Sequence, residues 1–119
     1  MTVREIVSLL DARVLMGTEH MSREVEGGCG SDLMSDVLAF VKENTALITG
    51  LTNTHVIRTA QMLDINCVIF TRGKVPGEDI LDKARELDLV VLSTEKTTYV
   101  SCGILYINGL PGAERQRPL

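Results

Sequence analysis

Apolar residues are arranged along this chain in two alternating patterns, one with helical spacing and one in short continuous runs. Helical spacing recurs in segments that we predict to be helices, at residues 3–10, 33–41, 55–63, 78–87 and 99–107. Apolar runs between them predict strands at residues 12–16, 46–51, 67–70 and 89–92, with a further strand near residues 24–26. Strand, helix and strand within about thirty residues form a βαβ unit. The predicted fold is therefore an α/β three-layer sandwich with a mainly parallel sheet of about five strands flanked by helices.

Local signals predict where the elements end. Thr2 followed by Glu5 has the pattern of a capping box, and Asn108 with Gly109 ends the last helix. Within the last helix, we expect five residues to face the core: Tyr99, Val100, Gly103, Ile104 and Ile107. Residues 110–119 contain two prolines and three charges without periodicity. We therefore expect a single domain over residues 1–109 and a flexible tail over residues 110–119.

The first two predicted strands follow one another closely, joined by the polar residues 18–22. Strands that are adjacent in sequence often pair as a hairpin, but they also occur apart in a sheet. Both arrangements fit the sequence, which leaves the pairing of these two strands open.

Glycines, small polar groups and acids converge in residues 24–37. A short apolar strand is expected to run into Gly27 and Gly28, after which Ser31 and Asp32 open the next helix. Glycine allows another backbone or a ligand to approach closely, and the first N–H groups of a helix lack partners within it. These residues are therefore candidates for binding a ligand.

The same stretch resembles a known signature. The segments REVEGG at residues 23–28 and SDLMSDV at residues 31–37 are similar to the signature of the DRTGG domain, and the similarity extends to Ile107. Ser22 stands where the family has Asp, and Glu26 where it has Thr, so no role of that carboxylate or hydroxyl is carried over.

The resemblance implies a regulatory setting. DRTGG domains accompany CBS domains in regulated pyrophosphatases, lie near the catalytic domain of phosphotransacetylases, and occur as small stand-alone bacterial proteins. The fold is also similar to the non-catalytic N-terminal domain of HPr kinase. That enzyme's chemistry resides in a separate P-loop domain, and this sequence has no P-loop motif. A kinase activity is therefore not expected.

Composition and charge disfavour several classes of function. A formal net charge of −4 without a Lys/Arg cluster disfavours nucleic-acid binding. No apolar run reaches the roughly 18 residues that span a membrane, and residues 1–5 do not begin a signal peptide. Three cysteines without a C-x-x-C pair indicate neither a disulfide framework nor a zinc knuckle. We expect a cytoplasmic protein that has no cofactor, no bound metal and no membrane partner.

Polar residues follow three of the predicted parallel strands, and ligands bind at that edge of open α/β sheets. The third strand is followed by Thr49, Thr52, Asn53, Thr54 and His55 just before a helix, where free N–H groups face an anion. Arg72 lies in segment 71–74 after the fourth strand, and Ser93 and Thr94 follow the fifth. Together these groups predict a phosphate or carboxylate site, or else helix caps and solvated turns.

Two enzymatic alternatives rest on the glycine stretch. Cys29 near a helix N-terminus has the setting of a reactive thiol, although no base lies nearby in sequence. Asp32 and Asp36, at i and i+4, would share a helix face and offer two oxygens to Mg²⁺. Both carboxylates also fit solvated acids at a helix start, where they oppose a bare phosphate.

The function that we predict is a non-enzymatic regulatory or ligand-sensing domain. Its ligand would be a nucleotide or another small anionic metabolite, and its signal would pass to a partner enzyme. The alternatives are a structural adaptor without a ligand and a small enzyme using Cys29 or the Asp32/Asp36 pair. We also expect a homodimer, with residues 27–36 near its interface and an apolar surplus from Val3, Val7, Leu10, Met34, Leu38 and Phe40.

Overall fold

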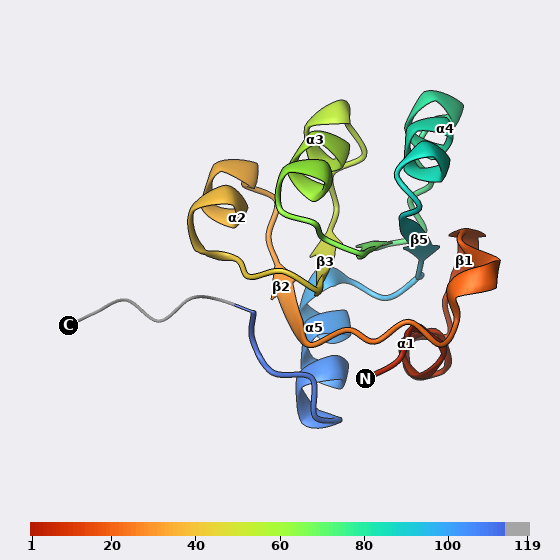
Figure 1. The fold of residues 1–119 in the computed structure, drawn as a ribbon. Coiled ribbons are helices and arrows are strands. Elements are labelled where there is room, and N and C mark those ends of the chain that lie inside the picture. The colour runs from red at the N-terminus through yellow and green to blue at the C-terminus, as the bar shows by residue number, and fades with distance from the viewer. Residues whose placement is uncertain (114–119) are drawn as a thin grey trace.

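One sheet of five strands organises the protein, in the order β1-β5-β4-β3-β2 (Figure 1). The computed structural model describes residues 1–113, apart from the side chain of Phe40. The strands are β1 (Arg13–Met16), β2 (Gly27–Gly30), β3 (Thr45–Thr49), β4 (Cys67–Phe70) and β5 (Val90–Ser93). The strands β2 to β5 are parallel, whereas β1 pairs antiparallel with β5. The prediction of a mainly parallel α/β sheet is confirmed, and the first two strands lie at opposite edges.

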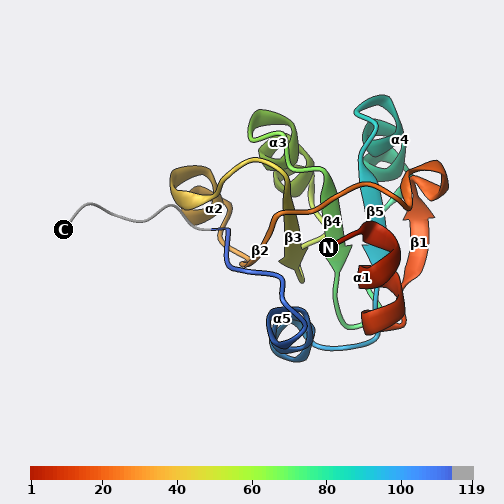
Figure 2. The same ribbon diagram turned by 60° about the horizontal axis from the view of Figure 1, so that its bottom comes forward.

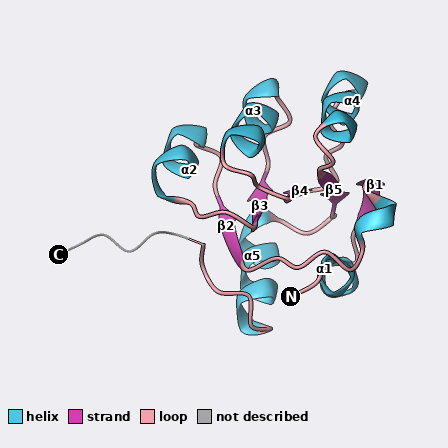
Figure 3. Ribbon diagram, viewed as in Figure 1, coloured by secondary structure: helices cyan, strands magenta, loops and turns pink. Residues whose placement is uncertain are grey.

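Helices cover both faces of the sheet. One layer consists of α2 (Met34–Phe40), α3 (Thr54–Met62) and α4 (Glu78–Glu86), and the other of α1 (Val3–Leu10) and α5 (Thr98–Ile107). Figure 2 shows the two layers on either side of the strands, and Figure 3 separates helices from strands by colour. A short 3-10 helix, η1 (Thr18–His20), follows β1. The three-layer prediction is therefore confirmed.

The three central strands β3, β4 and β5 are buried at every position because each contributes to two cores. Leu47 and Val68 pack against the layer of α2, α3 and α4, while their neighbours Ile48 and Ile69 pack on the α1 and α5 side. Alternate side chains of a strand point to opposite faces, so a strand covered on both faces needs apolar residues at every position.

Helix α1 begins as predicted, while the second strand begins later than predicted. Thr2 accepts from the Glu5 N–H and completes the capping box. The predicted strand at residues 24–26 is wrong, because Val25 donates instead to the Met1 carbonyl at 2.8 Å. The ladder with β3 starts only where Gly27 meets Thr45.

The predicted orientation of α5 is wrong for most of the residues named. Tyr99, Val100 and Ile107 are exposed, whereas Ser101 and Leu105 are buried. Seven of the ten residues of this helix are apolar and none is charged, so the sequence carries no charged side that would mark the solvent. Contacts with β2, β3 and α1 decide which side is inside.

The predicted start of the flexible tail, at residue 110, is too early, because residues 110–113 are docked on β2. Pro111 accepts from the Gly28 N–H at 2.9 Å, and the Ala113 N–H donates to the Gly28 carbonyl at 3.0 Å. Leu110 and Ala113 are buried. Residues 110–113 therefore cover the free edge of β2, and residues 114–119 lie outside the described part of the chain.

Most of the apolar surplus predicted for α1 and α2 is absorbed by the domain's own cores. Val3, Leu10 and Met34 are buried, while Leu38 is exposed. The side chain of Phe40 lies outside the description. Within residues 1–113, none of the helices combines the length and the apolar character needed to cross a membrane.

Candidate functional site

The carboxyl ends of β2, β3, β4 and β5 share one edge of the sheet, because these strands are parallel. The Arg72 N–H donates to the Lys96 carbonyl at 2.9 Å, and the Gly73 N–H donates to the Thr94 carbonyl at 2.8 Å. These bonds fix the loop after β4 against the loop after β5. The segments that the sequence placed at this edge therefore do lie together.

Asp32 reaches into this edge instead of opening a helix. Its Oδ1 accepts from the Thr49 hydroxyl at 2.9 Å and from the Gly50 N–H at 2.8 Å. Helix α2 begins at Met34 with Leu33 as a cap that lacks a side-chain hydrogen bond. The expected capping by Ser31 and Asp32 is wrong. The Asp32 carboxylate instead accepts the hydrogen bonds at the end of β3 that a bound anion would otherwise accept.

Lys74 and Asp32 lie on either side of Gly50. The Lys74 ammonium donates to the Gly50 carbonyl at 2.8 Å. A Cβ at Gly50 would lie 3.6 Å from Lys74 Nζ and 3.7 Å from both Asp32 carboxylate oxygens. The end of β3 is thus flanked by one cationic and one anionic group, both at the surface.

Arg72 has an unusual backbone. Its φ is 59°, and the other non-glycine residues with positive φ within residues 1–113 are aspartates and an asparagine, which tolerate this conformation better. Its neighbour Gly73 also has positive φ and lies against the Glu95 carboxylate. The Arg72 side chain is exposed and forms no ion pair within the described residues.

The N-terminus of α3 is partly occupied by its own cap. Asn53 accepts from the His55 N–H at 3.1 Å, which confirms its predicted capping role. Thr52 is half-buried before the cap, while His55 is exposed. No acid lies in the first turn of α3, so its positive end is not neutralised from within the helix. Thr54 lines a separate hollow of about 170 Å³ between α3 and α4.

Ser93 and Thr94 are used inside the fold. The Ser93 hydroxyl donates to the Lys74 carbonyl at 2.8 Å, and the Thr94 hydroxyl donates to the Leu10 carbonyl at 2.8 Å. Both residues are buried. They hold the β4 loop and α1 in place, so neither hydroxyl is available as a first contact for a ligand.

Thr98 belongs to the same edge although the sequence did not indicate it. Its hydroxyl lies 2.7 Å from that of Thr71 and connects the end of β4 to the start of α5. Thr71 was recognisable from its place after a buried strand. Thr98 was not, because no local pattern brings two residues 27 positions apart together.

The glycine stretch forms a strand and not a ligand loop. A Cβ at Gly27 would lie 2.9 Å from the Ala113 Cβ, and one at Gly28 would lie 3.1 Å from the Leu110 Cδ2. At Gly30 an added Cβ would collide with the Cys102 sulfur. These glycines are therefore explained by the close packing of residues 110–113 and α5 on β2.

The enzymatic alternatives lose their geometric basis. Cys29 lies within β2 and is buried in the core under α2 and α3 instead of at a helix N-terminus. Burial raises the pKa of Cys67 to about 12 and also raises the pKa of Cys102. Asp32 precedes α2 and Asp36 lies in its first turn, so they do not share a helix face.

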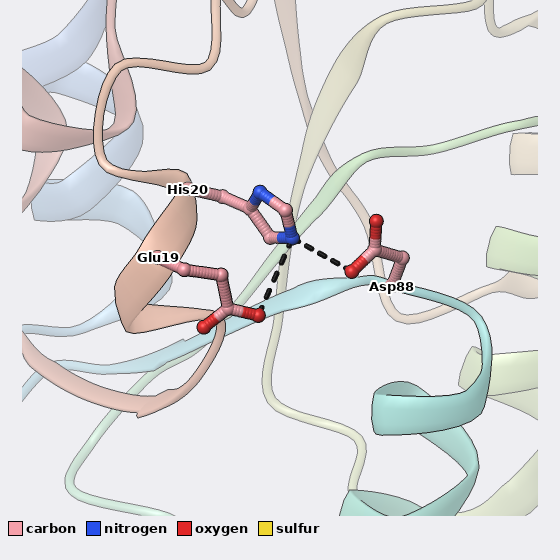
Figure 4. A group of neighbouring side chains, drawn as sticks. All are labelled: Glu19, His20 and Asp88. Atoms are coloured by element: carbon pink, nitrogen blue, oxygen red, sulfur yellow. Dashed lines mark hydrogen bonds and ion pairs between the residues drawn. The ribbon is translucent and has the colours of Figure 1, made fainter.

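A second polar group occupies the opposite edge of the sheet (Figure 4). His20 Nε2 lies 2.7 Å from an Asp88 carboxylate oxygen and 3.4 Å from one of Glu19. The hydrogen bond from His20, followed by the charges of His20 and Arg23, lowers the pKa of Asp88 despite a smaller opposing effect of desolvation. A cleft of about 290 Å³ lies beside this group, lined in part by Arg23 and Asn66. The sequence did not indicate this group, because His20 and Asp88 are 68 positions apart.

The comparisons identify the family. The sequence pattern of the DRTGG domain matches residues 5–106. The chain belongs to the DRTGG domain family. A search of curated protein sequences found no match.

A solved structure shares this DRTGG fold. It contains the CBS and DRTGG domains of the regulatory region of Clostridium perfringens pyrophosphatase, complexed with the activator diadenosine tetraphosphate. The TM-score is 0.74 at 16% sequence identity. The match covers 99% of this chain and 52% of the other, so this chain spans about half the length of its structural neighbour.

The signature residues of this DRTGG domain have structural roles. The Arg23 guanidinium donates to the carbonyls of Asn66 at 3.0 Å and Asp88 at 2.9 Å, connecting the segments before β4 and β5. Gly27 and Gly28 allow the close packing on β2. The two departures from the signature, Ser22 and Glu26, are both exposed. The signature thus supports the architecture, and the carboxyl edge remains the candidate site.

Proposed function

We propose that this DRTGG domain is a non-enzymatic regulatory domain that binds a small anionic metabolite at the carboxyl edge and signals to a partner enzyme. An adenine nucleotide is the first class to test, because the structural neighbour is a regulatory region complexed with a dinucleotide activator. We place the protein in the cytoplasm, where reduced thiols such as those of Cys67 and Cys102 persist.

Unpaired positive charge at the carboxyl edge is the observation that carries this proposal. Arg72, Lys74 and Lys96 come from two loops joined by backbone hydrogen bonds, and none forms an ion pair within residues 1–113. Acids lie at the same edge: Asp32 and Glu95 flank the loops, and Asp36, Glu78 and Asp79 lie in the first turns of α2 and α4. The three cations of the joined loops are therefore a local positive group, and the edge as a whole is not positively charged. Cations held on rigid loops beside a helix N-terminus are suited to a phosphate group.

The Asp32 carboxylate limits where an anion can bind at the carboxyl edge. It already accepts the hydrogen bonds that an anion at the end of β3 would accept. A phosphate must therefore bind beside it, toward Lys74 and Arg72, and is repelled by the Asp32 charge. Removing that charge while keeping the oxygen acceptor should strengthen anion binding.

Thermal unfolding with diadenosine tetraphosphate, ATP, AMP and inorganic phosphate tests the proposal. A ligand at about 100 times its Kd stabilises the folded state by about 2.7 kcal/mol, which raises Tm by roughly 10 °C in a domain of this size. Arg72→Gly removes the guanidinium and suits the left-handed backbone, so it should reduce the shift without disturbing the loop. Asp32→Asn should increase the shift.

Arg4→Ala is the matched control, because Arg4 is an exposed cation on α1 and its N–H donates to the Met21 carbonyl, in the segment before β2 and away from this edge. It should leave the ligand-induced shift unchanged. Equal losses in Arg4→Ala and Arg72→Gly would indicate non-specific charge attraction and contradict the site. If none of the four ligands changes Tm, adenine nucleotides and free phosphate are excluded as ligands. The same result across a broad panel of anionic metabolites would contradict the sensing function and make the adaptor without a ligand the better description.

A further inference from the structure

Helix α5 exposes an uncharged apolar stripe. Its ten residues include no acid and no base. The exposed fractions are 88% for Tyr99, 44% for Val100, 72% for Tyr106 and 83% for Ile107. We call these four residues, together with Gly103 between them, the α5 stripe.

Such a helix is normally buried all round. Helices that are apolar on every side occur inside proteins, whereas surface helices carry a polar side. Ser101 and Leu105 make the inner side of α5, and α1 lies next to it in the same layer (Figure 2). Within residues 1–113 the α5 stripe is left without a covering element, which is the setting of a protein interface.

Gly103 has no explanation inside the domain. Glycine in a helix interior costs about 0.5–1 kcal/mol relative to alanine. A Cβ at Gly103 would have nothing within 4 Å, unlike the glycines of β2, which are enclosed by packed atoms. A missing side chain in the middle of an exposed apolar stripe allows another helix to approach closely.

The spacing of the stripe is symmetric about Gly103. Tyr99 and Ile107 lie four positions before and after it, and Val100 and Tyr106 lie three positions before and after it. An identical helix running antiparallel, with Gly103 on a two-fold axis, therefore brings Tyr99 against Ile107 of the second copy and Val100 against Tyr106. We propose that the α5 stripe is a homodimer interface formed by antiparallel packing of α5 on a second copy of this chain.

Charge and area both favour a second copy as the occupant. Two chains of net charge −4 repel each other, but the uncharged stripe brings no like charges into contact, and antiparallel helix dipoles attract. The two tyrosines alone offer on the order of 300 Å² per copy. A standard interface buries about 800 Å² per partner. Ile107, Val100 and the polar residues around the stripe would supply the rest of this buried area.

This interface replaces the one expected from the sequence on α1 and α2, and it does not depend on the proposed ligand. Both tyrosines of the chain lie in the stripe and tryptophan is absent, so tyrosine fluorescence reports on the interface directly. Light scattering gives the mass and iodide quenching gives the exposure of the tyrosines. Both are measured on the full chain from about 5 to 500 µM, a range that brackets a weak dimer.

We expect the mass to rise from 13.0 kDa toward twice that value, with iodide quenching falling over the same range. Gly103→Lys has room in the monomer but none at a close helix contact, so it should hold the mass at 13.0 kDa. Ile107→Lys, at a position that is 83% exposed, should do the same. Met62→Lys is the matched control, because Met62 is equally apolar and 70% exposed but lies on α3 in the opposite layer.

Circular dichroism confirms that each variant is folded. A wild-type mass of 13.0 kDa throughout the range would overturn the proposal and leave the stripe to a different protein. A dimer that survives both Gly103→Lys and Ile107→Lys, or one that is lost in Met62→Lys, would overturn the placement on α5.

Discussion

The glycines of β2 allow a prediction whose sign depends on packing. At backbone angles open to all residues, Gly→Ala normally stabilises a protein by about 0.4–1 kcal/mol through the unfolded state. At Gly27 the added Cβ would lie 2.9 Å from the Ala113 Cβ and 3.0 Å from its Cα, and neither atom belongs to a flexible side chain. We therefore expect Gly27→Ala to destabilise the domain.

The loss of stability in Gly27→Ala depends on how the domain relieves the close contact with Ala113. Overpacking a tight site costs about 1–3 kcal/mol. The alternative is release of residues 110–113, which exposes Leu110, at about 1.5–3 kcal/mol, and breaks backbone hydrogen bonds worth about 0.5–1.5 kcal/mol each. Released residues regain about 1–2 kcal/mol each of backbone entropy, which offsets most of that loss. We expect a net loss of about 2 kcal/mol, or roughly 8 °C in Tm for a domain of this size.

Urea unfolding at one fixed protein concentration measures this loss. Gly112→Ala is the matched control, because an added Cβ there meets nothing within 4 Å in the same docked segment. It should be neutral or slightly stabilising. Ala113→Gly in the Gly27→Ala background should recover part of the loss, giving a favourable coupling in a double-mutant cycle. A Gly27→Ala protein as stable as the wild type would refute the packing explanation of the glycines.

Two further predictions concern titrating groups. Burial raises the pKa of Cys67 to about 12, so iodoacetamide at pH 7 should modify Cys67 only in unfolded protein. Mass spectrometry measures the modification. Rapid modification of Cys67 in the folded chain would contradict its burial. Because His20 lowers the pKa of Asp88 in the folded state, its stabilising contribution is present above about pH 3.9 and is lost as pH falls through the folded pKa. Asp88→Asn removes the charge and keeps a residue suited to the positive φ of this position. The difference in urea midpoint between wild type and Asp88→Asn should therefore shrink from pH 7 to pH 3. A difference that stays constant would exclude this linkage.

The carboxyl edge was predictable because it follows from strand order and direction. Loops after parallel strands lie at one edge in any such sheet, so Arg72 and Asn53 were placed correctly before their contacts were known. The hydrogen bonds at that edge were not predictable. Asp32 lies 17 positions from Thr49, and its choice between capping a helix and binding that hydroxyl depends on where β2 and β3 pair.

The amino-acid sequence by itself determined the sheet, the two layers of helices and most of the element boundaries, because these follow from local spacing of apolar residues and from caps such as Thr2 and Asn53. The tertiary structure alone decided that Gly27 and Gly28 pair as a strand, that Leu110 docks on it, and which side of α5 faces water. Glycine lacks a side chain that would signal its partner, and a helix that is apolar all round has no polar side to orient it. At such positions only contacts between distant segments select one arrangement.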